Sequence, residues 1–181
     1  MIRSDPTDRS LRPGDECLRR NDAEVLRRAQ ERAALAEALG ATDSDACGLL
    51  HAYGLRASTA ALVEWLPAVE VAWLDGADEA ERHALRVHFN VDDRVSAEGM
   101  ALLDGWLAVR PSDRLFDAAR LVLRARLLTL GAQEREALLA QVLALCEASG
   151  RSAGGCFGVG PLSSQERGRI TAIQGDLERP L

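Results

Sequence analysis

The sequence predicts an all-α protein, a compact bundle of about eight helices. Leu and Ala supply most of the apolar residues, which make up 47% of the 181 positions, and both are strong helix formers. Apolar residues recur at spacings of three and four along most segments, as on one face of a helix. Gly, Pro and N-cap residues separate these segments, and no segment shows the alternating pattern of a strand.

The element boundaries follow from start and stop residues. Residues 1–20 are expected to form a polar tail, because prolines and a glycine interrupt them, and residues 21–181 to form a single domain with internal duplication. Asn21, Ser96 and Ser163 are expected N-caps, and Gly40 and Gly54 are expected helix ends. The predicted helices cover residues 21–39, 42–53, 58–74, 78–89, 96–107, 113–130, 133–149 and 163–174.

The segment 58–74 is apolar on every face, so we expect it in the middle of the fold. Pro67 lies inside it and leaves the carbonyl of Val63 without a helical partner, which predicts a bend. Glu70 also lies in this apolar stretch. A buried carboxylate must be paired or protonated. Pairing with an arginine is therefore the expected state, and a functional acid is the alternative.

One arrangement occurs twice: an apolar helix ends at a glycine, and a capping box starts the next helix. In the first copy Asp75-Gly76 precedes Asp78-x-x-Glu81. In the second, Ser149-Gly150 is followed by a Gly-rich loop and then by a capping box. That box runs from Ser163 to Glu166, and each box satisfies two backbone N–H groups.

These residues resemble the signature of the TerB-like family, named for the tellurite-resistance protein TerB. The resemblance covers about residues 40–175, and the segment 96–115 is similar to a bacterial subgroup of the family. It implies an all-helical fold of two related halves, an acidic patch proposed to bind a divalent cation, and association with stress-response or envelope-linked complexes. Two departures bear on the metal: the first loop is one residue shorter than usual, and Ser149 stands where the family has an acid.

The candidate metal ligands lie at the first turn of this repeat. They are Asp75, Glu81, Glu70 and Asp78. Calcium or magnesium would be the cofactor, and no other cofactor is predicted. Because hard cations take six or more oxygen ligands, this short loop cannot supply a full set. The alternative is structural: Asp75 accepts hydrogen bonds from the start of the next helix, and Glu81 acts as a cap.

The composition limits the classes of partner that we expect this protein to bind. The net charge of −6 argues against nucleic-acid binding, which needs a basic field. No apolar run is long enough to span a membrane, so no membrane insertion is expected. Four widely spaced cysteines, with Cys47 and Cys146 in apolar helical patterns, predict buried free thiols and a reducing cytoplasm. The arginines between Arg110 and Arg126 are expected to form a solvated face or to meet an acidic partner.

Together these observations predict a cytoplasmic, non-enzymatic helical module, either monomeric or homodimeric, that acts through contacts with protein partners. The resemblance adds a bacterial stress-related context and the divalent cation at the first acidic turn. The alternative function is a ligand-binding or enzymatic bundle with a carboxylate pocket at Glu70 and Asp75.

Overall fold

A computed structural model describes residues 13–41, 44–76, 79–90, 94, 96–152 and 161–179. These residues form eight α-helices and one 3-10 helix, and none of them forms a strand, which confirms the all-α prediction. The elements are α1 Pro13–Leu39, α2 Ser44–Ala52, η1 Ala57–Glu64, α3 Leu66–Ala72, α4 Glu79–Asn90, α5 Ala97–Ala108, α6 Asp113–Thr129, α7 Ala132–Ser152 and α8 Ser164–Glu178.

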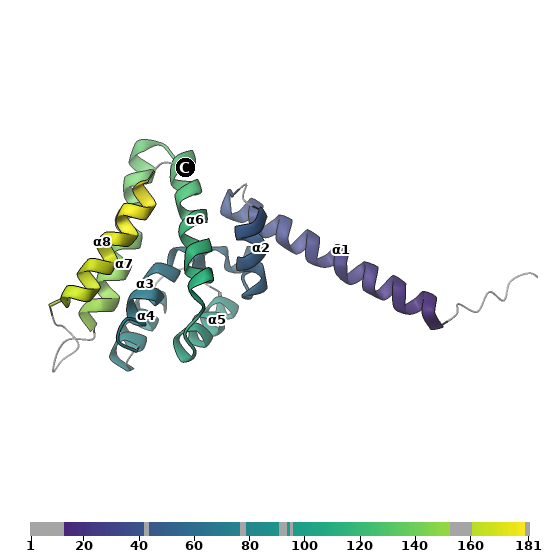
Figure 1. The fold of residues 1–181 in the computed structure, drawn as a ribbon, viewed down its shortest axis with the longest axis horizontal. Helices are drawn as coiled ribbons and strands as arrows, with labels where there is room; N and C mark the ends of the chain where they lie inside the picture. The colour runs from purple at the N-terminus through teal and green to yellow at the C-terminus, as the bar shows by residue number, and fades with distance from the viewer. Residues whose placement is uncertain are drawn as a thin grey trace, which may run out of the picture.

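The helices form a bundle from which one helix projects (Figure 1). Helices α6, α7 and α8 pack on one another, and α3 contacts all three as well as α4. Helix α2 packs on α6, and α5 packs on η1 and α4. Helix α1 touches η1 and α2 near its C-terminal end and then extends away from the bundle.

The chain from 57 to 72 is the centre of the fold, as its apolar composition predicted. Every residue from 62 to 72 is buried. The first half of this segment is a 3-10 helix and not an α-helix, and the change falls at Trp65, two residues before Pro67. Since proline has no N–H, the carbonyl of Val63 has no α-helical donor. Just before Pro67, the Trp65 N–H donates to the Leu62 carbonyl, three residues earlier, at 3.0 Å, which is the spacing of a 3-10 helix.

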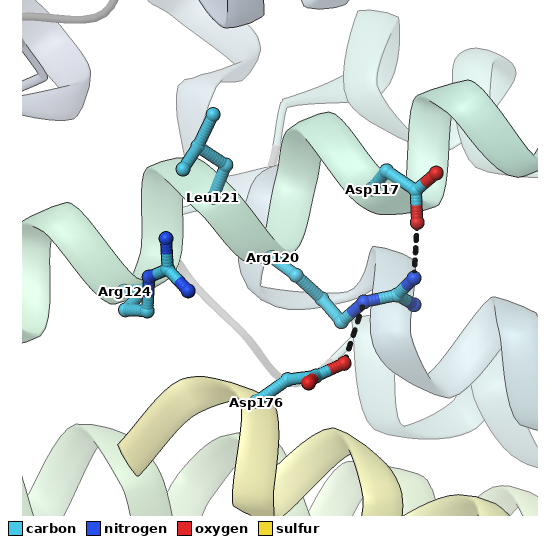
Figure 2. A pocket seen from close by; sticks show the side chains of 5 residues that line it. All are labelled: Asp117, Arg120, Leu121, Arg124 and Asp176. Atoms are coloured by element: carbon cyan, nitrogen blue, oxygen red, sulfur yellow. Dashed lines mark hydrogen bonds and ion pairs between the residues drawn. The ribbon is translucent and has the colours of Figure 1, made fainter. Parts of the chain in front are cut away.

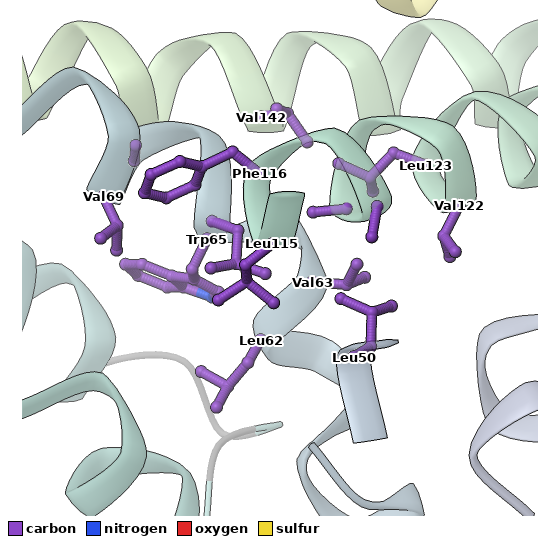
Figure 3. Close-up of a cluster of buried hydrophobic side chains, with 14 of the residues drawn as sticks. Leu50, Leu62, Val63, Trp65, Val69, Leu115, Phe116, Val122, Leu123 and Val142 are labelled. Atoms are coloured by element: carbon purple, nitrogen blue, oxygen red, sulfur yellow. The ribbon is translucent and has the colours of Figure 1, made fainter. Parts of the chain in front are cut away.

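The core forms where this segment meets α6 and α7 (Figure 3). Trp65 lies edge-on to Phe89 of α4, with ring centroids 4.6 Å apart. Phe116 and Leu123 from α6, and Val142 from α7, belong to the same core cluster as this segment. A helix that is apolar all round is thereby buried by several neighbours.

Several boundaries agree with the sequence and three do not. Ser96 and Ser163 cap α5 and α8 as predicted, and Gly40 and Gly54 end α1 and α2 with positive φ. Helix α1 starts at Pro13, eight residues before the predicted Asn21, because proline suits the first turn of a helix and does not break it there. Helix α8 continues to Glu178, past the predicted end at residue 174.

Gly150 does not end α7, which continues to Ser152. A Cβ atom at Gly150 would lie 2.6 Å from Cδ2 of Leu162 and 3.2 Å from Oε1 of Glu166. Gly150 therefore serves close packing of α7 against the start of α8. In the first copy of the repeat Gly76 does adopt positive φ, 115°, so the two glycines play different parts.

Candidate functional site

Glu70 is a buried carboxylate clamped by two arginines. Its side chain is 3% exposed, and its two oxygens accept hydrogen bonds from Arg120 of α6 and Arg169 of α8. This confirms the prediction that an arginine compensates Glu70. Each carboxylate oxygen is paired with the guanidinium group of an arginine from another helix, so Glu70 stabilises the junction of α3, α6 and α8.

Glu64 is a second buried carboxylate, which the sequence reasoning missed. It is 1% exposed and accepts from Arg94 at 2.8 Å, from Arg126 at 2.7 Å and from the Gln141 amide at 3.1 Å. The signal that singled out Glu70, an acid inside an apolar run, applies equally to Glu64 in the sequence LVEWL.

The two clamps share a spacing of six residues. Glu64 and Glu70 pair with Arg126 and Arg120, so α6 runs antiparallel to the η1–α3 segment. The prediction of a solvated arginine face was wrong for these two arginines, which turn inward toward the buried acids. Arg120 is only 13% exposed. A helix that carries cations on its buried face needs such partners, because an unpaired buried charge is costly.

A hollow of about 220 Å³ lies between α6 and α8, and we call it the α6/α8 hollow (Figure 2). Its lining residues are Asp117, Arg120, Leu121, Arg124 and Asp176. Arg120 bridges the two aspartates, with Nε 3.6 Å from Oδ2 of Asp176.

Arg124 stands apart from these ion pairs in Figure 2. Its Nε is buried and has no hydrogen-bond acceptor among the described residues. The hollow is thus lined by two guanidinium groups. That of Arg120 is paired with carboxylates, and that of Arg124 forms no ion pair with the described residues.

The projecting part of α1 is a second candidate site. No residue from 21 to 34 is buried, and Val25 and Leu26 are 59% and 64% exposed. A hollow of about 270 Å³ continues this surface toward α2. It is lined by Ala29, Arg32, Ala33, Ala36 and Cys47.

Polar contacts anchor α1 where it leaves the bundle. Glu31 forms a hydrogen bond with His51 Nε2 of α2 at 3.1 Å and lies 3.7 Å from Nε of Arg56. The hydrogen bond from His51, followed by the charges of Arg27 and Arg56, holds the pKa of Glu31 below its usual value. The anchor fixes the direction in which α1 projects.

The structure does not bring the predicted metal ligands together at one site. Asp75 is exposed in the turn after α3, and Glu70 is held by arginines. Asp78 and the side chain of Glu81 lie outside the described residues. Within the described part of the chain, no three His, Cys, Asp or Glu side chains gather as a metal site would require. None of the three hollows described by their lining residues includes Glu70 or Asp75.

Two of the predicted free thiols are confirmed. Cys47 and Cys146 are buried and form no disulfide. Burial, reinforced by the charge of Glu70, raises the pKa of the Cys146 thiol far above its usual range. Such a thiol stays protonated and packs as a small apolar group. The predicted Gly-rich loop and the side chains of Cys17 and Cys156 lie outside the described residues.

No helix in the described ranges combines the length and hydropathy needed to cross a membrane. Comparison with known proteins finds no matching family model, no similar curated protein and no similar solved structure. The resemblance to the TerB-like family therefore stays a prediction, and the function has to be argued from the two sites just described.

Proposed function

We propose that this protein is a non-enzymatic interaction module that binds a helix along the exposed face of α1. The observation that supports this is the pair Val25 and Leu26, whose side chains are 59% and 64% exposed on a helix that projects from the bundle. Exposed apolar residues that are contiguous on a rigid element are typical of interaction surfaces.

The shape of this face suits a helix. Leu26, Ala29, Ala33 and Ala36 follow one another at spacings of three and four, and Val25 lies four residues before Ala29. These five residues form one stripe along α1, which we call the α1 stripe. Its alanine half borders the hollow of about 270 Å³ beside Cys47. Small side chains let a second helix approach closely. An amphipathic helix can then pack its apolar face along the groove, because its apolar residues recur at the same spacings of three and four.

The occupant we propose is α1 of a second copy, in antiparallel orientation. The α1 stripe has a large half, at Val25 and Leu26, and a small half, from Ala29 to Ala36. An antiparallel pair places the large half of each copy on the small half of the other. Such a two-fold interface is self-complementary, because each copy contributes the same surface. Dimers of this symmetry are the commonest homo-oligomers.

The charges on this face permit the pairing. The segment from 21 to 39 contains four acids and three arginines, so two copies do not repel strongly. Glu24 and Glu31 already pair with Arg27 on the same helix. Arg32 lines the hollow and forms no ion pair with the described residues, so it is available to an acid of the second copy.

The proposed contact between the two α1 helices is short, so we expect it to be weak. Sixteen residues of helix, from 21 to 36, extend about 24 Å. Stable interfaces bury about 1,200 Å² or more, and smaller ones are transient. We therefore expect a reversible dimer whose population depends on protein concentration.

Sedimentation velocity over a range of concentrations tests this proposal. The wild-type protein should shift from monomer to dimer, whereas Leu26→Glu should remain a monomer because it places a charge in the apolar contact. Leu128→Glu is the matched control, since Leu128 is an exposed leucine on α6, and it should dimerise like the wild type. A wild type that is monomeric at all concentrations, or a control that fails equally, would refute self-pairing through α1.

The resemblance to TerB-like proteins supports the same class of function, because it implies assemblies with other proteins, and it adds a stress-related context to the proposal. A carboxylate pocket at Glu70 and Asp75 has less support. Both oxygens of Glu70 are already taken by Arg120 and Arg169, and Asp75 lines none of the three hollows.

A further inference from the structure

We infer that the α6/α8 hollow binds a free α-amino acid with an apolar side chain. The inference is independent of the α1 stripe, since it rests on different helices. Its basis is the arrangement of charges in the hollow, where one unengaged guanidinium lies near two carboxylates that have oxygens to spare.

Arg124 would bind the carboxylate of the ligand. Arg120 cannot serve, because Glu70, Asp117 and Asp176 already surround its guanidinium. Arg124 has no ion pair with a described residue, and its buried Nε lacks an acceptor. A guanidinium binds a carboxylate through two parallel hydrogen bonds, which gives the orphaned donor a partner once the side chain turns into the hollow.

Asp117 and Asp176 would bind the ammonium group. Asp117 uses Oδ1 toward Arg120, and Asp176 uses Oδ2. The other oxygen of Asp117 therefore has no partner among the described residues. Within the part of the chain that the structure describes, the second oxygen of Asp176 pairs only with Arg179, at 3.8 Å on the surface. An ammonium group is a compact donor of three hydrogen bonds, so it can be shared between two such carboxylates.

The remaining lining residue, Leu121, favours an apolar side chain on the ligand. At about 220 Å³ the hollow is smaller than the usual range for drug-sized ligands, so it suits a small metabolite. A neighbouring hollow of about 320 Å³ shares Asp117 and Leu121, and its other lining residues are Asp45, Ala46, Leu49, Arg114 and Ala118. A branched or aromatic side chain can extend into it, so leucine and phenylalanine fit better than glycine.

Isothermal titration with three related probes tests the inference. L-Leucine carries both charges, 4-methylpentanoate lacks the ammonium group, and 3-methylbutylamine lacks the carboxylate. We expect millimolar or tighter binding of L-leucine and at least tenfold weaker binding of the other two probes. No heat of binding with 20 mM L-leucine, or equal binding of one single-charge probe, would overturn the inference.

Variants locate the binding. Arg124→Gln should weaken L-leucine binding at least tenfold without changing the unfolding midpoint, because Arg124 supports no ion pair within the described residues. Asp176→Asn should weaken L-leucine more than 4-methylpentanoate. Arg167→Gln is the control, since Arg167 is an exposed arginine of α8 that lines none of the described hollows. Equal losses in the Arg124 and Arg167 variants would place the binding elsewhere and contradict the inference.

Discussion

Replacing Glu70 by glutamine should destabilise the protein by about 3 kcal/mol. Glu70 is 3% exposed and its two oxygens accept from Arg120 and Arg169. Breaking a buried ion pair by removing one partner costs about 3–5 kcal/mol. The lower end applies because Arg120 keeps Asp117 and Asp176, and because Arg169 lies closer to the surface. For a chain of this size, that loss lowers the melting temperature by about 6–12 °C.

Urea denaturation followed by circular dichroism measures the effect. Glu64→Gln should behave similarly, since Glu64 is equally buried and holds two arginines. Glu24→Gln is the control, because its ion pairs lie on the exposed surface of α1 and such pairs contribute little. If Glu70→Gln unfolds at the same urea concentration as the wild type, the two arginine clamps do not stabilise the core and the reasoning is wrong.

Other predictions concern the turns and the thiols. Ser163→Ala should cost about 1 kcal/mol in urea denaturation, because the Glu166 N–H loses the Ser163 oxygen as its acceptor; an unchanged midpoint would contradict the capping box. Gly168→Ala, in open space on α8, should stabilise by up to about 1 kcal/mol. Gly150→Ala should lack that gain, because the new methyl group meets Leu162 and Glu166. Cys146 should resist iodoacetamide in the native protein up to pH 9, since its raised pKa keeps the thiol protonated; rapid modification would contradict its burial. The family resemblance also implies a cation at the turn of Asp75. If it binds there, calcium or magnesium at millimolar concentration should raise the melting temperature and Asp75→Asn should remove the rise; an unchanged melting temperature would contradict it.

Local signals account for the elements that the sequence predicted well. The N-caps at Ser96 and Ser163 are hydrogen bonds between residues three apart, so they are visible in the sequence itself. Helix α6 begins at Asp113, as predicted, although Ser112 before it forms no side-chain cap hydrogen bond, and the helix ends one residue before the predicted boundary. The apolar character of 58–74 likewise predicted its central position.

Features that depend on tertiary contacts were not predictable in this way. The role of Gly150 depends on how closely α8 approaches α7. The partners of Glu70 are 50 and 99 residues away in the chain, so the sequence could indicate that an arginine pairs with it but not which one. The apolar residues of 21–39 alternate with arginines and glutamates, as on any amphipathic helix. That pattern does not show whether another helix covers the apolar face, because the answer depends on how the whole bundle is assembled.

Hydrogen–deuterium exchange at increasing protein concentration tests the central claim, that α1 pairs with a second copy, most directly. Amides in the segment 21–34, which has no buried residue in the monomer, should exchange fast in dilute protein and more slowly as dimers form. Amides of α3 and α7 should exchange at the same rate throughout. Exchange in α1 that does not depend on concentration would contradict pairing through this helix.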